Sequence, residues 1–188
     1  MITNTEALIL LLSGICILLI IIPAVLCGNV PVPTSLAVQA RMLDILPKPL
    51  PKKAQMKIYE LGSGWGSLAR ALATQYPAYK VVGIEISIIP WIFSRIMLLL
   101  RPKKNLEFQL CNFFNTDISD CRLAVCYLAP STMKRLYSKF CKELPLGSLI
   151  LSNTFSLRGW TVMRSAIASD LYQSKIFLYM RSSDPELN

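Results

Sequence analysis

Residues 58–66 read Ile-Tyr-Glu-Leu-Gly-Ser-Gly-Trp-Gly, and this stretch decides the fold. A short apolar run meets glycines at three alternate positions, Gly62, Gly64 and Gly66. Glycine is needed where the backbone takes a positive φ or must approach a ligand without an intervening Cβ. A helical pattern follows the turn at once, and a helix N-terminus offers free N–H groups. The order of strand, tight turn and helix predicts the ligand-binding turn of an open α/β sheet.

Two carboxylates distinguish this turn from a dinucleotide-binding turn. The glycine order is G-x-G-x-G rather than G-x-G-x-x-G, and Glu60 stands two residues before the first glycine. A carboxylate there suits an amino-bearing ligand better than a pyrophosphate. The next apolar strand pattern ends in Glu85, which can accept both hydroxyls of a ribose. Both acids fit S-adenosylmethionine, although a simple glycine turn with a solvated Glu85 is the alternative.

The turn and its acids resemble the cofactor motif of the class I S-adenosylmethionine-dependent methyltransferases. The resemblance rests on residues 60–66 and on Gly83-Ile84-Glu85. It implies an α/β fold with a Rossmann-like, seven-stranded, mostly parallel sheet and helices on both faces. It also implies S-adenosylmethionine as the cofactor. The cofactor-binding residues are then expected to be Glu60, Gly62, Ser63, Gly64, Gly66, Glu85 and Asn112.

Strand and helix patterns alternate along the middle of the chain, which predicts a parallel sheet with right-handed crossovers. Strands are expected at about 56–61, 80–85, 106–111, 123–128 and 148–153, and helices at about 65–76, 89–100 and 131–143. The final segments, about 161–168 and 175–180, are expected to form the antiparallel hairpin typical of methyltransferase sheets.

The N-terminal part of the chain predicts an anchor and a linker. Residues 7–27 carry no charge, and as a helix they would be roughly 31 Å long, enough to cross a bilayer core. A signal peptide is disfavoured because no basic residue precedes the run, while a hydrophobic hairpin or a buried helix is the other alternative. We therefore expect a transmembrane anchor at 1–29, a proline-rich linker with a short helix at 30–55, and a methyltransferase domain at 56–188.

The charge pattern bears on location and partners. The chain has 188 residues, 20 of them basic and 11 acidic, for a net charge of +9. Basic residues are absent before the apolar run and frequent after it, so the positive-inside rule predicts a single-pass protein with its domain on the cytoplasmic or equivalent inner side. Basic residues beside an anchor favour a lipid bilayer over nucleic acid as a partner. The sequence has no histidine and no Cys-x-x-Cys pair, so we expect no metal centre.

Three further stretches resemble a narrower family over roughly residues 31–180. They are Val32-Pro33-Thr34, Ile89-Pro90-Trp91-Ile92, and Val125–Leu128 with the following Ala129-Pro130. Together with one N-terminal apolar segment, they resemble the small membrane-anchored protein-lysine methyltransferases that modify the ATP synthase c-subunit and the adenine nucleotide translocase. The resemblance implies a lysine of a membrane protein as the acceptor.

The chain departs from that family at three positions. Trp65 stands in the glycine turn where an acid is usual, Glu60 replaces a frequent aspartate, and Asn112 replaces an acid after the third strand. An asparagine can still hydrogen-bond adenine, so we do not expect a loss of activity. The identity of the substrate is the property that these departures affect most.

The acceptor is expected over the carboxyl ends of the first and fourth strands. Tyr127 and Pro130 are the candidate catalytic residues there, and Trp91 and Trp160 are candidate pocket walls, with core packing as the alternative for each tryptophan. Methyl transfer needs an aligned, neutral lysine rather than a dedicated base. The segment 128–131, Leu-Ala-Pro-Ser, lacks the Asn-Pro-Pro-Tyr motif of adenine methylases, which disfavours a nucleic-acid substrate.

Two other functions remain open. One is a small-molecule or lipid methyltransferase, and the other is a non-catalytic S-adenosylmethionine- or nucleotide-binding membrane module. An NAD-dependent oxidoreductase is disfavoured by the glycine spacing. The helix pattern over 91–100 is apolar almost all round, so it predicts either a buried helix or a face resting on a bilayer with the basic side chains of 101–104 at headgroup level.

Overall fold

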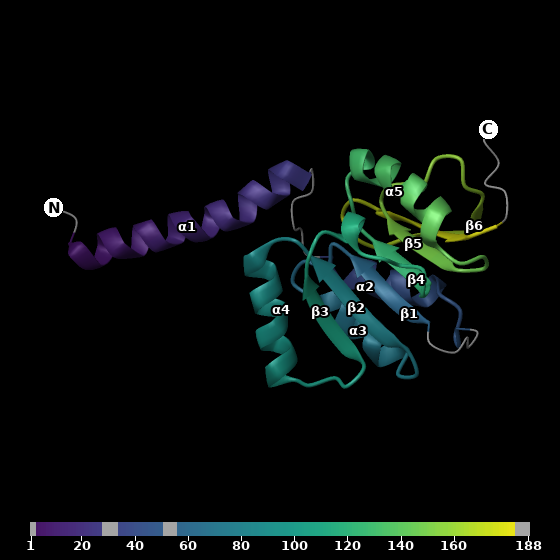
Figure 1. Ribbon diagram of the computed structural model, residues 1–188, viewed down its shortest axis with the longest axis horizontal. Coiled ribbons are helices and arrows are strands. Elements are labelled where there is room, and N and C mark those ends of the chain that lie inside the picture. The colour runs from purple at the N-terminus through teal and green to yellow at the C-terminus, as the bar shows by residue number, and fades with distance from the viewer. Residues whose placement is uncertain (1–2, 28–33, 51–55, 183–188) are drawn as a thin grey trace.

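The computed structural model describes residues 3–27, 34–50 and 56–182. Seven strands form one sheet in the order β3-β2-β1-β4-β5-β7-β6 (Figure 1). The strands are β1 (Lys57–Leu61), β2 (Lys80–Glu85), β3 (Leu106–Leu110), β4 (Cys121–Cys126), β5 (Leu149–Asn153), β6 (Val162–Ile167) and β7 (Lys175–Met180). The first five are parallel, and β7 runs antiparallel to both β5 and β6. The predicted Rossmann-like methyltransferase sheet is confirmed.

Two helices precede the first strand, and the others lie between successive strands as the sequence pattern predicts. The helices are α1 (Asn4–Cys27), α2 (Leu36–Ile45), α3 (Ser67–Gln75), α4 (Ile88–Leu100) and α5 (Pro130–Glu143), with a short 3-10 helix η1 (Phe113–Asn115) after β3. Apart from α1, which begins three residues before the predicted 7–27, each strand and helix bound agrees with the predicted one within two residues. Among the strands the largest difference is in β4, which ends at Cys126, so that Tyr127 and Leu128 lie in the connection that leads to α5.

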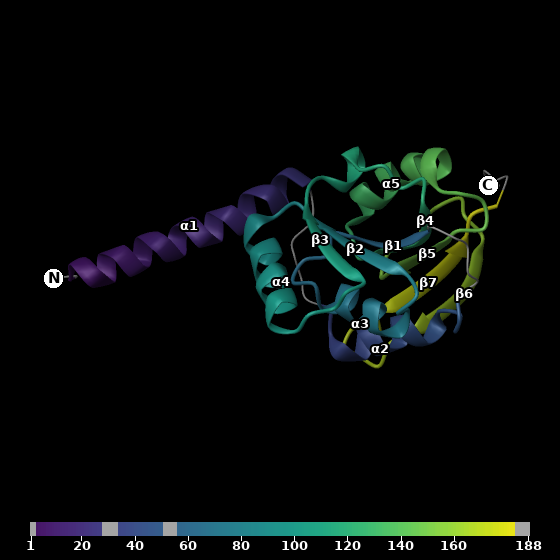
Figure 2. The ribbon, with the colours of Figure 1, turned by 60° about the horizontal axis from the view of Figure 1, so that its bottom comes forward.

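Both faces of the sheet are covered, which explains why its central strands are almost continuously apolar. One apolar cluster joins the sheet to α2 and α3 through side chains such as Met42 and Leu72. The opposite cluster joins it to α5 through Met133, Leu136 and Phe140. Figure 2 shows α2 and α3 on one side of the sheet, α5 on the other, and α4 beside β3 at the edge.

The strand order reverses direction at β1, whose two neighbours are β2 and β4. Such a switch point opens a crevice at the carboxyl ends of the strands, because the connections on either side leave toward opposite faces. The glycine turn follows β1 directly. The fold therefore places the predicted cofactor turn at the position where open α/β sheets bind ligands.

The expected transmembrane anchor at 1–29 needs correction. Residues 4–27 do form a helix, α1, which extends away from the sheet and contacts α4 (Figure 1). Within the described residues, however, no helix combines the length and hydropathy that crossing a bilayer requires. The expectation rested on the length and the lack of charge of residues 7–27, which by themselves do not establish a span. The single-pass location inferred from it is therefore wrong.

The proposed linker falls partly outside the described residues, which omit 28–33 and 51–55 and with them Val32 and Pro33. Its predicted short helix is α2, which begins after Ser35, whose side chain accepts a hydrogen bond from the backbone N–H of Val38. Because α2 packs into the same apolar cluster as α3, it contributes to the core of the sheet domain. A domain boundary at residue 56 stays a prediction.

Candidate cofactor and acceptor site

The three glycines of the turn between β1 and α3 all have positive φ angles. The values are 77° for Gly62, 51° for Gly64 and 79° for Gly66. The turn is fixed to β2, because the backbone N–H groups of Gly62 and Ser63 both donate to the carbonyl oxygen of Ile84, at 2.9 and 2.8 Å. The left-handed conformation explains why glycine is needed at these positions.

Close packing adds a second reason for glycine at both ends of the turn. A Cβ on Gly62 would lie 2.9 Å from Cδ2 of Leu128, which follows β4. A Cβ on Gly66 would lie 2.5 Å from Cζ of Phe108 in β3 and 2.9 Å from Cβ of Ser94 in α4. The first contact brings the predicted cofactor turn directly against the predicted acceptor segment.

Glu60 is buried at the end of β1, with only 6 % of its surface exposed. Its Oε2 atom has no hydrogen-bond partner within the described residues. Burial raises the pKa of this carboxyl well above its ordinary value, the backbone N–H of Ala69 lowers it, and the charge of Glu85 raises it further. A buried carboxyl with a free oxygen is well suited to receive an ammonium group, as the sequence predicted for the amino end of the cofactor.

Glu85 makes hydrogen bonds within the protein that the sequence did not predict. Its Oε2 accepts a hydrogen bond from the backbone N–H of Gly64 at 2.8 Å, and its Oε1 accepts from Ile86 and Ser87 at 3.0 and 2.8 Å. The carboxylate thus ties the glycine turn to the start of α4. A carboxylate offers about four lone-pair positions, and three are used here, so about one remains for a ribose hydroxyl. The contact of Glu85 with the ribose stays a prediction.

Two further predicted cofactor residues lie at the same edge of the sheet. Ser63 is buried, and its hydroxyl has no partner within the described residues. Asn112 follows β3, and its Oδ1 accepts a hydrogen bond from the backbone N–H of Phe114 at 2.9 Å, which caps η1. Cys111 lies beside the end of β2, because its N–H donates to the carbonyl oxygen of Glu85. Contact of Asn112 with adenine stays a prediction.

The acceptor segment follows the end of β4, beside β1. Tyr127 is half-buried, Leu128 is buried against the glycine turn, and Pro130 is exposed as the first residue of α5. Proline is favoured at that position because its missing N–H would have no helical partner. The structure therefore brings Tyr127 and Pro130 to the same edge as Glu60, while their catalytic roles stay predictions.

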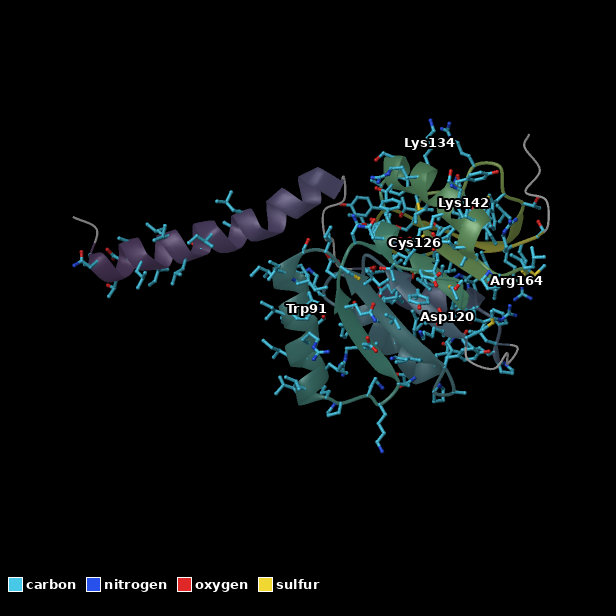
Figure 3. All side chains as sticks on the ribbon, viewed as in Figure 1. Trp91, Asp120, Cys126, Lys134, Lys142 and Arg164 are labelled. Atoms are coloured by element: carbon cyan, nitrogen blue, oxygen red, sulfur yellow. The ribbon has the colours of Figure 1, made fainter. Side chains whose placement is uncertain are left out.

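The two tryptophans predicted as pocket walls have packing roles. Trp91 packs against the cluster under α3, and its Nε1 donates to the carbonyl oxygen of Phe108 at 3.3 Å. Figure 3 shows Trp91 on α4, well away from Cys126 at the end of β4. Trp160 is buried in the cluster under α5, edge-on to Tyr137. The core-packing alternative therefore describes both residues better.

Thr154 is a candidate site residue that sequence reasoning missed. It follows β5 at the carboxyl edge of the sheet and has a φ of 67°, which is unusual for a β-branched residue. Its N–H donates to the carbonyl oxygen of Lys175 at 2.6 Å, which holds the chain in this conformation. Strained residues often cluster at binding edges, but a threonine gives no sequence signal for a left-handed conformation.

The described ranges contain no group of three or more histidine, cysteine, aspartate or glutamate side chains arranged to hold a metal ion. The groups that do converge are a buried carboxyl, a glycine turn with a free helix N-terminus behind it, and an apolar acceptor segment. The buried free oxygens of Glu60 and Ser63 and the Cβ-free surface at Gly62 fit the amino-acid end of S-adenosylmethionine.

This fold and site define an S-adenosylmethionine-dependent N-methyltransferase. A protein-family model described as the ANTKMT methyltransferase domain matches residues 60–164, more than half of the chain. The chain belongs to this family.

Individual relatives agree with that assignment. A protein-lysine N-methyltransferase of Saccharolobus islandicus (strain REY15A) is 33 % identical over 136 residues, which cover 69 % of this chain and 78 % of the relative. The adenine nucleotide translocase lysine N-methyltransferase of Mus musculus is 29 % identical over 108 residues, which cover 55 % of this chain and 45 % of the relative. The chain therefore matches less than half of the mouse protein's length.

A solved structure supports both fold and cofactor. An RNA methyltransferase from Salinibacter ruber, in complex with S-adenosyl-L-homocysteine, superposes with a TM-score of 0.71 and 25 % identity. The match covers 84 % of this chain and 98 % of that one. S-adenosyl-L-homocysteine is what remains of S-adenosylmethionine after methyl transfer, so the shared fold is one that holds this cofactor.

Proposed function

We propose that the chain transfers a methyl group from S-adenosylmethionine to the side-chain amine of a lysine in a membrane protein. The observation that supports the proposal most directly is the close packing of Leu128, in the expected acceptor segment, against Gly62 of the glycine turn. Relatives named as protein-lysine and adenine nucleotide translocase lysine methyltransferases support lysine as the acceptor.

In this proposal the amino-acid end of the cofactor is held at the β1 turn. Glu60 accepts its ammonium group through the free Oε2 atom, and Ser63 offers its unpartnered hydroxyl. A Cβ on Gly64 would meet nothing within 4 Å, so this part of the turn leaves space for the cofactor, while Gly62 and Gly66 pack closely against Leu128 and Phe108. At the other end Glu85 accepts a ribose hydroxyl at the one lone-pair position that its bonds to Gly64, Ile86 and Ser87 leave, and Asn112 contacts adenine.

The acceptor side must deliver a neutral lysine in line with the methyl group. S-adenosylmethionine supplies a methyl group on a positively charged sulfur, which is already a good leaving group. The chain's part is to align the two reactants and exclude water. Leu128 and the half-buried ring of Tyr127 form apolar surroundings in which a lysine loses its proton more easily, since desolvation lowers an amine's pKa. Pro130 fixes the start of α5 behind them.

The proposal is tested by radiolabelled methyl transfer into extracts of cells that lack the gene. The extract is incubated with labelled S-adenosylmethionine and wild-type protein or Glu60→Ala, and it is then separated into membrane protein, soluble protein, lipid and RNA. We expect label in a discrete membrane-protein band that requires Glu60. The matched control is Glu107→Ala, which should retain transfer. It removes a partly exposed acid that pairs with Lys80 near the amino end of β3, at the opposite edge of the sheet from the site. Label only in lipid, RNA or soluble protein would contradict the proposal.

A further inference from the structure

Helix α4 carries an apolar face that remains largely exposed, although α1 contacts this helix. Only Pro90 and Ser94 of this helix are buried, so the expectation of a buried helix is wrong. Six large apolar side chains are more than a third exposed, and Leu99 and Leu100 reach 75 % and 68 %. The exposed set is Ile88, Ile92, Phe93, Ile96, Leu99 and Leu100. Their spacing of three and four residues places them on one continuous side of the helix.

The charged residues of α4 and of the segment that follows it all have one sign. From residue 88 to residue 104 the sequence contains four basic residues and no acidic one. Arg95 lies within the helix, and Arg101, Lys103 and Lys104 follow its C-terminal end. An apolar helix face bordered by basic side chains matches the two layers of an anionic lipid surface, acyl chains below and headgroups above.

The face is held rigidly against the cofactor turn. The rings of Phe93 and Trp65 meet edge to face, with centroids 5.3 Å apart. Arg70 of α3 donates hydrogen bonds to the carbonyl oxygens of Met97 and Arg101 at 3.1 and 3.0 Å, which satisfies the C-terminal end of α4. The exposed side of α4 therefore belongs to a helix that contacts with the rest of the fold hold in place.

We infer that the exposed face of α4 docks on the surface of an anionic bilayer, with the helix lying along the headgroup boundary. A 13-residue helix is about 20 Å long, too short to cross a bilayer of about 30 Å. The contact is therefore superficial and reversible. This inference goes beyond the proposed function, because it concerns binding to lipid and needs no methyl acceptor.

The test uses the full chain and vesicles of phosphatidylcholine with or without phosphatidylserine. We expect flotation with the anionic vesicles, and at least about a tenfold weaker partition for Leu99→Asp, since a buried leucine contributes about 1.5–3 kcal/mol. The matched control is Leu171→Asp, because Leu171 is 91 % exposed on the β6–β7 connection. Binding of S-adenosylmethionine by both variants confirms that they are folded.

Charge reversal gives an independent variant pair. Arg101→Glu with Lys104→Glu should weaken partition by more than about tenfold, because each basic residue near an anionic surface contributes about 1 kcal/mol. Lys134→Glu with Lys142→Glu changes the charge equally on α5, which lies apart from α4 (Figure 3), and should change partition little.

Helix α1 also exposes apolar side chains, including Leu8 and Leu12, so the contact must be located as well as detected. Hydrogen exchange on the vesicle-bound wild-type chain should show protection of residues 92–104 and none of α5. Equal flotation of Leu99→Asp and Leu171→Asp, or unprotected α4 amides, would overturn the inference. So would self-association in lipid-free solution that Leu99→Asp abolishes, since α4 would then be an interface between copies. Methyl transfer is measured separately, and its loss or retention does not decide this test.

Discussion

At the residue scale, Gly62 combines a left-handed backbone with a close contact to the acceptor segment. We predict that Gly62→Ala lowers the affinity for S-adenosylmethionine by at least about tenfold, or about 1.4 kcal/mol, because the new Cβ meets Leu128. Calorimetric titration measures the affinity. Gly147→Ala is the control, because Gly147 has a φ of 80° but its Cβ would lie 3.8 Å from the nearest atom. Both variants should lose about 1–2 kcal/mol of stability to backbone strain, and only Gly62→Ala should lose affinity.

The raised pKa of Glu60 predicts that this residue makes stability depend on pH in an unusual way. Its pKa is raised in the folded chain, so the folded state binds a proton more readily than the unfolded state, whose carboxyl has the ordinary value of 4.5. The contribution of Glu60 to stability without cofactor should therefore be fully present below pH 4.5 and should be lost as the pH rises from there through the folded-state pKa.

Urea unfolding of wild type and Glu60→Gln across this range measures the effect. The stability of Glu60→Gln relative to wild type should increase with pH, because the amide cannot ionise. Glu107→Gln should behave in the opposite sense, because hydrogen bonds from Gln109 and Lys80 lower the pKa of Glu107. The contribution of ionised Glu107 to the free energy of unfolding is present above pH 4.5, and it is lost as the pH falls through the lowered pKa of Glu107. A parallel pH dependence of wild type and Glu60→Gln would refute the assignment of Glu60.

At the scale of elements, the contact between the glycine turn and α4 should be measurable as a coupling energy. A double-mutant cycle of Trp65→Leu and Phe93→Leu is expected to give about 0.5–1.5 kcal/mol in unfolding free energy, because the rings meet edge to face. The control cycle combines Phe93→Leu with Tyr172→Leu and should give no coupling energy, since Tyr172 is exposed on the β6–β7 connection. Equal values in the two cycles would mean that Trp65 does not connect the turn to α4.

Most elements were predictable because strand and helix periods are local properties of the chain. β2 and β7 have the predicted bounds because each apolar run stops at charged or polar residues. β4 ends two residues early because the apolar run continues through Tyr127 and Leu128 into the acceptor connection. Periodicity also could not show that the apolar helix α4 leaves one side uncovered, since exposure depends on which elements pack against it.

At the scale of the whole molecule, the sequence predicted which side chains lie together but not their contacts. The proximity of Glu60 and Glu85 was predictable because the ends of neighbouring parallel strands lie at one edge of the sheet, and their binding roles stay predictions. The bonds of Glu85 to Gly64, Ile86 and Ser87 depend on tertiary geometry and were not predictable. The transmembrane anchor was inferred from the length and the lack of charge of residues 7–27, and no described helix meets the requirements for a span.

The measurement that tests the central claim most directly is the chemical identity of the methylated residue. Protein labelled by wild type is hydrolysed in acid, and the radioactive amino acid is identified by chromatography against methylated lysine, arginine and histidine standards. We predict methylated lysine, lost with Glu60→Ala and retained with Glu107→Ala. Label in any other amino acid, or label that does not depend on Glu60, would contradict the account.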